Sequence, residues 1–162
     1  MSKTNTPLEG MRVAILAVDG VENTELTEPR KALEQAGAKT TVFSPKKGNI
    51  QSLKRMEKAE PIEVDATLEQ ADPENFDAVL LPGGAMNADH LRVQPRAPEF
   101  VRSMDRQGKP IAVICHGAVA VDFGRPPAWT KPHQLSHNSG RYPQRWWKVA
   151  GCRGGARLEL DK

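Results

Sequence analysis

A cysteine followed by a histidine, Cys115-His116, stands directly after an apolar run and directly before Gly117. A thiol in this setting can act as a nucleophile, because the thiolate is the reactive form and a helix beginning here would lower the thiol pKa. A core cysteine is the simpler interpretation, since cysteine is among the residues most often buried. The motif predicts catalysis only if partners for the thiol lie elsewhere in the chain.

Two glutamates and a glycine pair are candidate partners. Glu22 and Glu25 are three residues apart at the start of an expected helix, so their carboxylates project from neighbouring faces. A carboxyl aimed at Cys115 would share a proton with the thiolate, with a raised carboxyl pKa and a lowered thiol pKa. Gly83-Gly84 can bring bare backbone N–H groups to a substrate oxygen, with the His116 N–H as second donor. Equally, the glutamates could complement the helix dipole and the glycines could form a plain turn.

His116 needs an orienting group to act as a base, because it follows the nucleophile in sequence and does not face it. Asp89, five residues after Gly84, is a candidate, contributed from a neighbouring subunit rather than from its own chain. Asp89 could equally cap or flank a short helix around residues 87–91. Both interpretations stay open at the level of sequence.

The elements that would position these residues alternate between strand and helix. Short apolar runs predict strands over residues 11–18, 38–44, 76–82 and 110–115, and helical periodicity predicts helices over 22–36 and 95–107. Residues 46–60 are charged and are expected to be an irregular surface excursion, with a short strand near 62–64. The alternation predicts a Rossmann-like (flavodoxin-like) α/β sandwich with a parallel sheet. In such sheets the ligand site lies at the carboxyl ends of the strands, where all the candidate residues fall.

Residues 11–117 resemble the PfpI branch of the DJ-1/PfpI superfamily through three segments in order, AILAVDGVENTELTEPRKALEQAG, FDAVLLPGGAMNADHLR and GKPIAVICHG. The resemblance implies a class I glutamine amidotransferase-like fold, with Cys115 as nucleophile and His116 as its neighbour. It implies Glu22 as the acid beside the thiol, with Glu25 as the alternative. It also implies that Asp89 is the acidic partner of the histidine across the interface of a homodimer or higher homo-oligomer.

The resemblance implies three functions. The first is a cofactor-free stress-response enzyme of glyoxalase or deglycase type, in which Cys115 adds to a small reactive carbonyl and Glu22 or His116 transfers a proton. The second is an intracellular cysteine peptidase, a hydrolase acting on peptides through Cys115, His116 and Asp89. The third is a non-enzymatic redox sensor or chaperone, in which the thiol is oxidised to sulfinic acid. No cofactor and no metal are expected for any of them.

Composition bounds the protein class. No apolar run approaches the eighteen or so residues that span a bilayer, so no membrane partner is expected. Cys115 and Cys152 have no disulfide-framework spacing, and the chain is expected to be cytoplasmic. Residues 1–10 are polar and are expected to be a disordered tail ahead of a domain over 11–117. Lys and Arg number 15 against 17 Asp and Glu in residues 1–117, but 8 against 3 in residues 118–162, so the basic charge belongs to the last part.

Residues 118–162 have neither helical nor strand periodicity, and they depart from the family pattern. A reading-frame slip explains the departure. Tryptophan has a single codon, so Trp146-Trp147 read one base over must become Gly-Gly, and the remaining codons permit PWQLISAARL, GRSLTS and DDIRNAGGKWLDAEVV. These strings resemble the family's missing helix, strand and final motif, in order. We therefore expect an irregular, frameshifted tail from about Ala118 and a chain that is weakly active or an inactive product.

The same hypothesis bears on two other readings of the tail. Its basic residues and three tryptophans could suggest a nucleic-acid surface, and His133, His137 and Cys152 could suggest zinc ligands. Residues produced by a shifted frame carry no such meaning. No nucleic-acid partner is expected.

Overall fold

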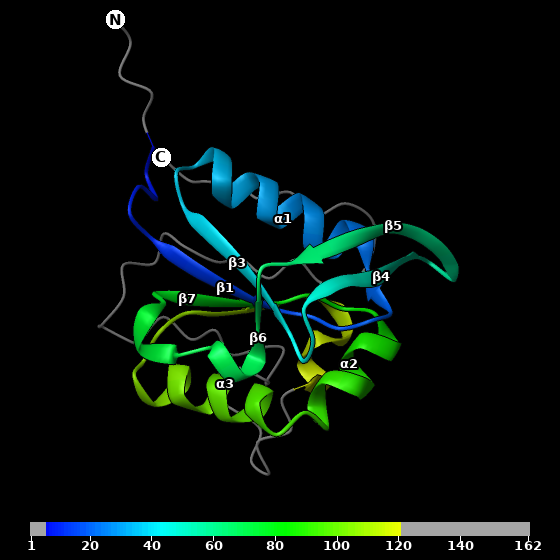
Figure 1. The fold of residues 1–162 in the computed structure, drawn as a ribbon. Coiled ribbons are helices and arrows are strands. Elements are labelled where there is room, and N and C mark those ends of the chain that lie inside the picture. Colours follow the sequence, from blue (N-terminus) through cyan, green and yellow to red (C-terminus); the bar gives the residue numbers. More distant parts are fainter. Residues whose placement is uncertain (1–5, 121–162) are drawn as a thin grey trace, which may run out of the picture.

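The computed structural model describes residues 6–120, which form an α/β sandwich (Figure 1). Within this range, five strands pair in parallel in the order β6-β3-β1-β7-β8. The strands are β1 (Arg12–Leu16), β3 (Lys39–Ser44), β6 (Ala66–Thr67), β7 (Ala78–Leu81) and β8 (Ile111–Val113). The parallel sheet confirms the predicted fold class, and each predicted apolar run contains one of its strands.

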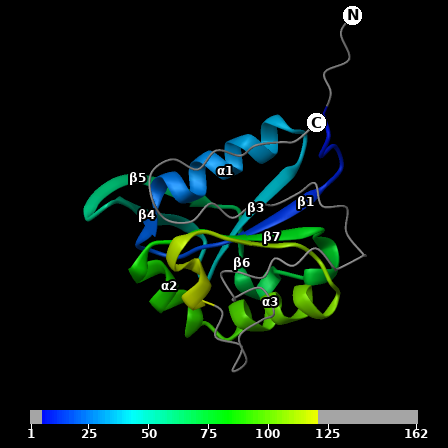
Figure 2. The ribbon, with the colours of Figure 1, turned by 180° about the vertical axis from the view of Figure 1, so that it is seen from behind.

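Helices cover both faces of the sheet (Figure 2). Helix α1 (Asn23–Gln35) lies on one face, and α2 (Ala85–Arg92) and α3 (Arg96–Arg106) lie on the other. Strand β1 contributes alternate residues to the two cores: Ile15 packs with Leu26 of α1, and Leu16 packs in the cluster that contains Phe100 and Met104 of α3. Burial on both faces is why this strand is a continuous apolar run.

Residues 46–60 are not the irregular excursion that the sequence predicts. They form most of an antiparallel hairpin of β4 (Gly48–Lys54) and β5 (Glu57–Val64), and the two-residue strand β2 (Val21–Glu22) pairs in parallel with β4. The hairpin extends as an arm beside α1 (Figure 1). The hairpin buries few side chains, namely Ile50 and Ser52 from β4 and Ile62 and Val64 from β5. Charged neighbours therefore obscure the alternation of buried and exposed residues in the sequence.

Short 3₁₀ segments complete the described part: η1 (Leu68–Gln70), η2 (Pro73–Asn75) and η3 (Cys115–Ala120). The folded domain also begins earlier than residue 11, because Leu8 is buried and its backbone N–H donates to Ala36 O at 2.8 Å. Residues 6–10, which were expected to be disordered, therefore belong to the folded domain. Residues 1–5 lie outside the described residues. Most of the expected irregular tail, residues 121–162, lies outside them too. In the range 6–120, none of the helices has the length and apolar character needed to cross a membrane.

Candidate active site

Three loops meet where the strand order of the sheet reverses. The chain runs outward from β1 to β3 and β6 on one side, and from β7 to β8 on the other, so the switch point lies between β1 and β7. Strand β2, which follows the loop after β1, contacts the loop after β7 directly, because the Glu22 N–H donates to Gly83 O at 3.2 Å. The loop after β8 joins them, since Ile114 N–H donates to Leu81 O at 3.0 Å. This is the edge at which open α/β sheets bind ligands.

Cys115 is presented on a strained turn. Its φ is +50°, a left-handed conformation that is uncommon outside glycine and is concentrated at functional sites. The turn is tight because a Cβ at Gly117 would overlap Leu81 O, so only glycine permits this approach. The side chain of Cys115 is exposed to solvent, so the core-cysteine interpretation is wrong. The segment that follows is the short 3₁₀ stretch η3 rather than an α-helix, so the described residues do not supply the expected helix dipole.

Glu25, and not Glu22, lies beside the thiol. The Glu25 carboxyl is within hydrogen-bonding reach of the Cys115 thiol and of the Gly83 backbone N–H. Glu22 points elsewhere, and its Oε2 accepts a hydrogen bond from the Arg55 backbone N–H at 2.9 Å. The reason is local: Glu22 belongs to the extended strand β2 and precedes the first turn of α1, whereas Glu25 lies inside that turn. The structure thus places the alternative acid, Glu25, at the thiol, and the catalytic role of either carboxyl stays a prediction.

Burial raises the pKa of the Glu25 carboxyl above its usual value, and the negative charge of Glu22 raises it further. The contacts with Gly83, Cys115 and His116 favour the carboxylate but do not cancel these effects. One oxygen, Oε2, is buried and makes no hydrogen bond of good geometry within the described part of the chain. An oxygen in this setting is more stable as part of a neutral carboxylic acid. The arrangement therefore extends upward the pH range over which Glu25 is protonated beside the sulfur.

Contrary to the expectation from sequence, the His116 ring faces the nucleophile, with its Nδ1 3.1 Å from Cys115 Sγ, and the ring is exposed. Asp89 lies on α2, where it forms an ion pair with Arg92 at 2.6 Å. Within residues 6–120 of one chain, no hydrogen bond or ion pair joins Asp89 to His116. The expected contribution of Asp89 from a second subunit stays a prediction.

The two glycines after β7 allow the loops to pack closely. A Cβ at Gly83 would overlap Glu25 Oε2 and would lie 2.9 Å from Cys115 Cβ. Gly84 has a φ of +97°, and a Cβ there would overlap Gly20 O and lie 2.8 Å from Glu22 N. The glycines therefore do more than form a plain turn, because any side chain would separate Glu25 from the thiol. Their role as oxyanion donors stays a prediction.

Asn87 is a site residue that the sequence analysis missed. It is fully buried in α2, and its amide connects the exit of β1 with the exit of β7 through hydrogen bonds to Val18 N, Pro82 O and Gly83 O. An asparagine inside a short helix, three residues after a glycine pair, was the available signal, because asparagine is an unfavourable residue in a helix interior. The apolar pattern of the chain does not reveal its burial.

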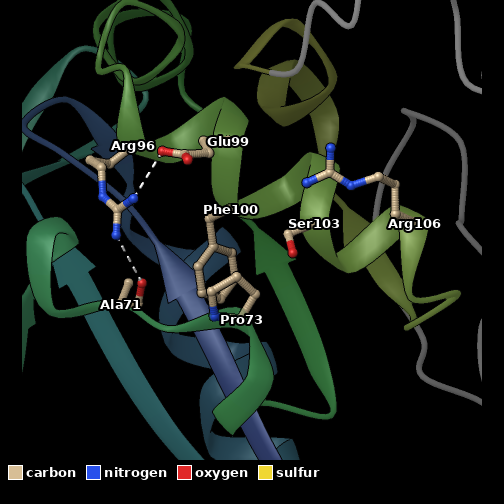
Figure 3. A pocket seen from close by; sticks show the side chains of 7 residues that line it. All are labelled: Ala71, Pro73, Arg96, Glu99, Phe100, Ser103 and Arg106. Carbon is tan, nitrogen blue, oxygen red and sulfur yellow. Dashed lines mark hydrogen bonds and ion pairs between the residues drawn. The ribbon is translucent and has the colours of Figure 1, made fainter.

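A surface hollow beside α3 contains none of the candidate residues (Figure 3). Arg96 lies on its rim and is held by Glu99 at 2.9 Å and by Ala71 O at 3.5 Å. The residues lining the hollow are Ala71, Pro73, Arg96, Glu99, Phe100, Ser103 and Arg106. Throughout the described residues, no three His, Cys, Asp or Glu side chains are grouped to hold a metal ion.

The model of the DJ-1/PfpI family matches residues 11–121. The chain belongs to this family. General stress protein 18 of Bacillus subtilis is 31% identical over 137 residues, which cover 81% of this chain and 78% of that protein. A deglycase of Pyrococcus abyssi is 37% identical over 107 residues, which cover 66% of this chain and 61% of the deglycase.

Solved DJ-1/PfpI structures share the fold. A two-domain protein from Anabaena variabilis, with DJ-1/ThiJ/PfpI-like and ferritin-like domains, is 35% identical with a TM-score of 0.63. The match covers 68% of this chain and 31% of that one. The chain spans less than two thirds of the Pyrococcus deglycase and of the Anabaena protein, and the family model ends at residue 121.

Proposed function

We propose that this chain carries the active site of a cofactor-free thiol enzyme that acts on small reactive carbonyl compounds. The observation that carries the proposal is the contact between the Cys115 thiol, on its strained turn, and a Glu25 carboxyl whose pKa burial raises. A thiolate beside a neutral acid is a nucleophile paired with a proton donor. The similarity to a deglycase and to a general stress protein supports the same class of chemistry.

The first step is addition to the aldehyde carbon of a dicarbonyl such as methylglyoxal. The Cys115 sulfur forms the C–S bond, the carbonyl π electrons move onto oxygen, and Glu25 gives that oxygen its proton. The product is a hemithioacetal, and Glu25 is left as the carboxylate. The developing oxyanion would lie near the backbone N–H groups of Gly83 and Gly84, which would stabilise it.

The second step moves a proton between the two former carbonyl carbons. Glu25, now a carboxylate, removes the proton from the carbon bonded to sulfur, and the proton of the hemithioacetal hydroxyl passes to the neighbouring carbonyl oxygen. Glu25 then returns its proton to the neighbouring carbon, which gives the thioester. Water then cleaves the thioester, which releases a 2-hydroxy acid and restores the thiol. The sequence is an internal redox reaction plus hydrolysis, so it needs no external oxidant or reductant.

The test is the conversion of methylglyoxal to lactate by the purified chain, followed by ¹³C NMR. We expect slow turnover in this chain that depends on Cys115, that is absent in Cys115→Ala, and that falls about 100-fold or more in Glu25→Gln, as for other proton-transfer groups. Glu22→Gln is the matched control, because it changes an equivalent carboxyl that lies away from the sulfur. Lactate formation equal to that of Cys115→Ala would overturn the proposal.

A second candidate is peptide hydrolysis, which the 3.1 Å contact between His116 Nδ1 and Cys115 Sγ favours. A triad would also require Asp89 from a second subunit. Cleavage of a fluorogenic peptide that is lost in Asp89→Asn, with methylglyoxal turnover retained, would support this candidate. Peptide cleavage that survives in Cys115→Ala would exclude it.

A further inference from the structure

A single buried amide connects the two loops beside Cys115. Asn87 is 0% exposed, and its Oδ1 accepts a hydrogen bond from the Val18 backbone N–H at 2.8 Å, at the exit of β1. Its Nδ2 donates to Pro82 O at 3.0 Å and to Gly83 O at 3.2 Å, at the exit of β7. These partners define which end of the amide is oxygen. In the reverse orientation the Nδ2 donor would face the Val18 N–H donor, and the Oδ1 acceptor would face the two carbonyl oxygens.

We propose that Asn87 is a positioning residue that aims the backbone N–H groups of Gly83 and Gly84 at the reaction centre. The inference rests on the proposed function of Cys115 and Glu25. A trans peptide holds its C=O and its N–H in opposite directions, and none of the described peptides is cis. Because Asn87 holds the Pro82 carbonyl, the Gly83 N–H of that peptide points away from Asn87. That direction leads to the Glu25 carboxyl, which lies against Gly83.

The next peptide is fixed in the same way. The Gly83 carbonyl accepts from Asn87 Nδ2 and from the Glu22 backbone N–H, both at 3.2 Å, so the Gly84 N–H points away from both donors. Glycine peptides rotate easily because no Cβ restricts them. Without the amide of Asn87, the Pro82 carbonyl loses this donor and the Gly83 carbonyl keeps only the Glu22 N–H, so both peptides are less restrained.

The alternative role of Asn87 is to tie α2 to the sheet, with no influence on the reaction. Two reactions of the same thiol separate the roles. Addition to a carbonyl builds negative charge on an oxygen that needs oriented N–H donors, whereas alkylation by iodoacetamide displaces iodide and creates no such oxyanion. If the N–H groups lose their orientation, addition to the carbonyl should therefore become slower, and alkylation by iodoacetamide should keep its rate.

The test uses Asn87→Asp, which keeps the shape and the acceptor for Val18 N–H but opposes oxygen to two carbonyls. Asn87→Ser, which adds no carboxyl, is used beside it and replaces it if Asn87→Asp does not fold. We expect kcat for methylglyoxal to fall about 100-fold with KM little changed, and the alkylation of Cys115 to keep its rate. Val101→Ala, at a buried residue of α3, is the control for a variant that loses stability but keeps the amide of Asn87.

A second readout needs no turnover. In the parent chain the NMR shift of the Gly83 amide should follow the ionisation of Glu25, and this titration should be lost in both Asn87 variants. A Gly83 titration that persists in the variants overturns the inference, as does an unchanged kcat in an active parent or an equal loss of turnover and alkylation. A parent that turns over no methylglyoxal, yet loses the Gly83 titration on substitution of Asn87, overturns the proposed function and leaves the inference standing.

Discussion

The Glu22 carboxylate closes the tip of the β4–β5 hairpin, because its Oε2 accepts a hydrogen bond from the backbone N–H of Arg55 at 2.9 Å. Arg55 itself adopts a left-handed φ of +62°. Glu22 thus connects two structures that are distant in sequence: the start of α1, which carries Glu25, and the arm that extends beside it. Its negative charge also disfavours ionisation of Glu25.

Two substitutions at Glu22 should separate these effects. Glu22→Gln retains an acceptor for the Arg55 N–H, so its free energy of unfolding should stay close to that of the parent. Glu22→Ala loses the acceptor and should be less stable by about 1 kcal/mol, the usual contribution of one hydrogen bond. Urea denaturation of the three proteins is the measurement. Equal stability of Glu22→Ala and Glu22→Gln would mean that the hydrogen bond contributes nothing.

Glu25 should make the stability of the domain depend on pH. Its pKa is raised in the folded state, so its stabilising contribution is complete below the unfolded pKa and is lost as the pH rises through the folded pKa. Glu25→Gln has no charge to bury. We therefore expect this variant to be more stable than the parent at about pH 8, with the advantage disappearing toward about pH 4.

Denaturant unfolding of the parent and Glu25→Gln across this pH range provides the check. Glu34→Gln is a useful comparison, because the pKa of the Glu34 carboxyl is shifted in the opposite direction to that of Glu25. The Glu34 carboxyl pKa is lowered by hydrogen bonds from Thr40 and Arg30, which outweigh its burial. A difference between parent and Glu25→Gln that stays constant with pH would show that Glu25 is not perturbed by folding.

Gly84 should tolerate substitution less well than Gly48, although both have a positive φ, of +97° and +107° respectively. A Cβ at Gly48 meets nothing within 4 Å, so Gly48→Ala should cost only backbone strain, about 1–3 kcal/mol. A Cβ at Gly84 overlaps Gly20 O, so Gly84→Ala should cost more and should also slow methylglyoxal turnover. Thermal unfolding and turnover of both variants test this. Indistinguishable variants would contradict the close packing of the two loops.

The sequence predicted the parallel sheet well, and it predicted the hairpin and the acid at the thiol poorly. Strands buried on both faces, such as β1, are uninterrupted apolar runs, which are easy to recognise. The β4–β5 arm buries only alternate residues such as Ile50 and Ile62, among many charges. The choice between Glu22 and Glu25 depends on the residue at which α1 begins, and a helix boundary is uncertain by one or two residues from pattern alone.

The role of Asn87 could not be read from the sequence for a different reason. Its three partners are backbone groups of Val18, Pro82 and Gly83, which become neighbours only when β1, β7 and α2 have assembled. A backbone group has the same chemistry at every residue, so no residue type marks it as a partner. Only the burial of a polar side chain, seen in the structure, shows that such partners must exist.

The last prediction concerns the gene. If residues 118–162 are translated out of frame, the nucleotide sequence read one base over from about the Ala118 codon should encode PWQLISAARL, then GRSLTS, then DDIRNAGGKWLDAEVV, including the Gly-Gly required by Trp146-Trp147. Restoring the frame should add the apolar segments that the present tail lacks, and burial of each large side chain contributes about 1.5–3 kcal/mol. We therefore expect the frame-restored protein to melt at a higher temperature and to turn over methylglyoxal faster than the present chain, as measured by calorimetry and by lactate formation. Codons that give unrelated strings in the shifted frame would exclude the frameshift, and the tail would then be a genuine extension of this family member.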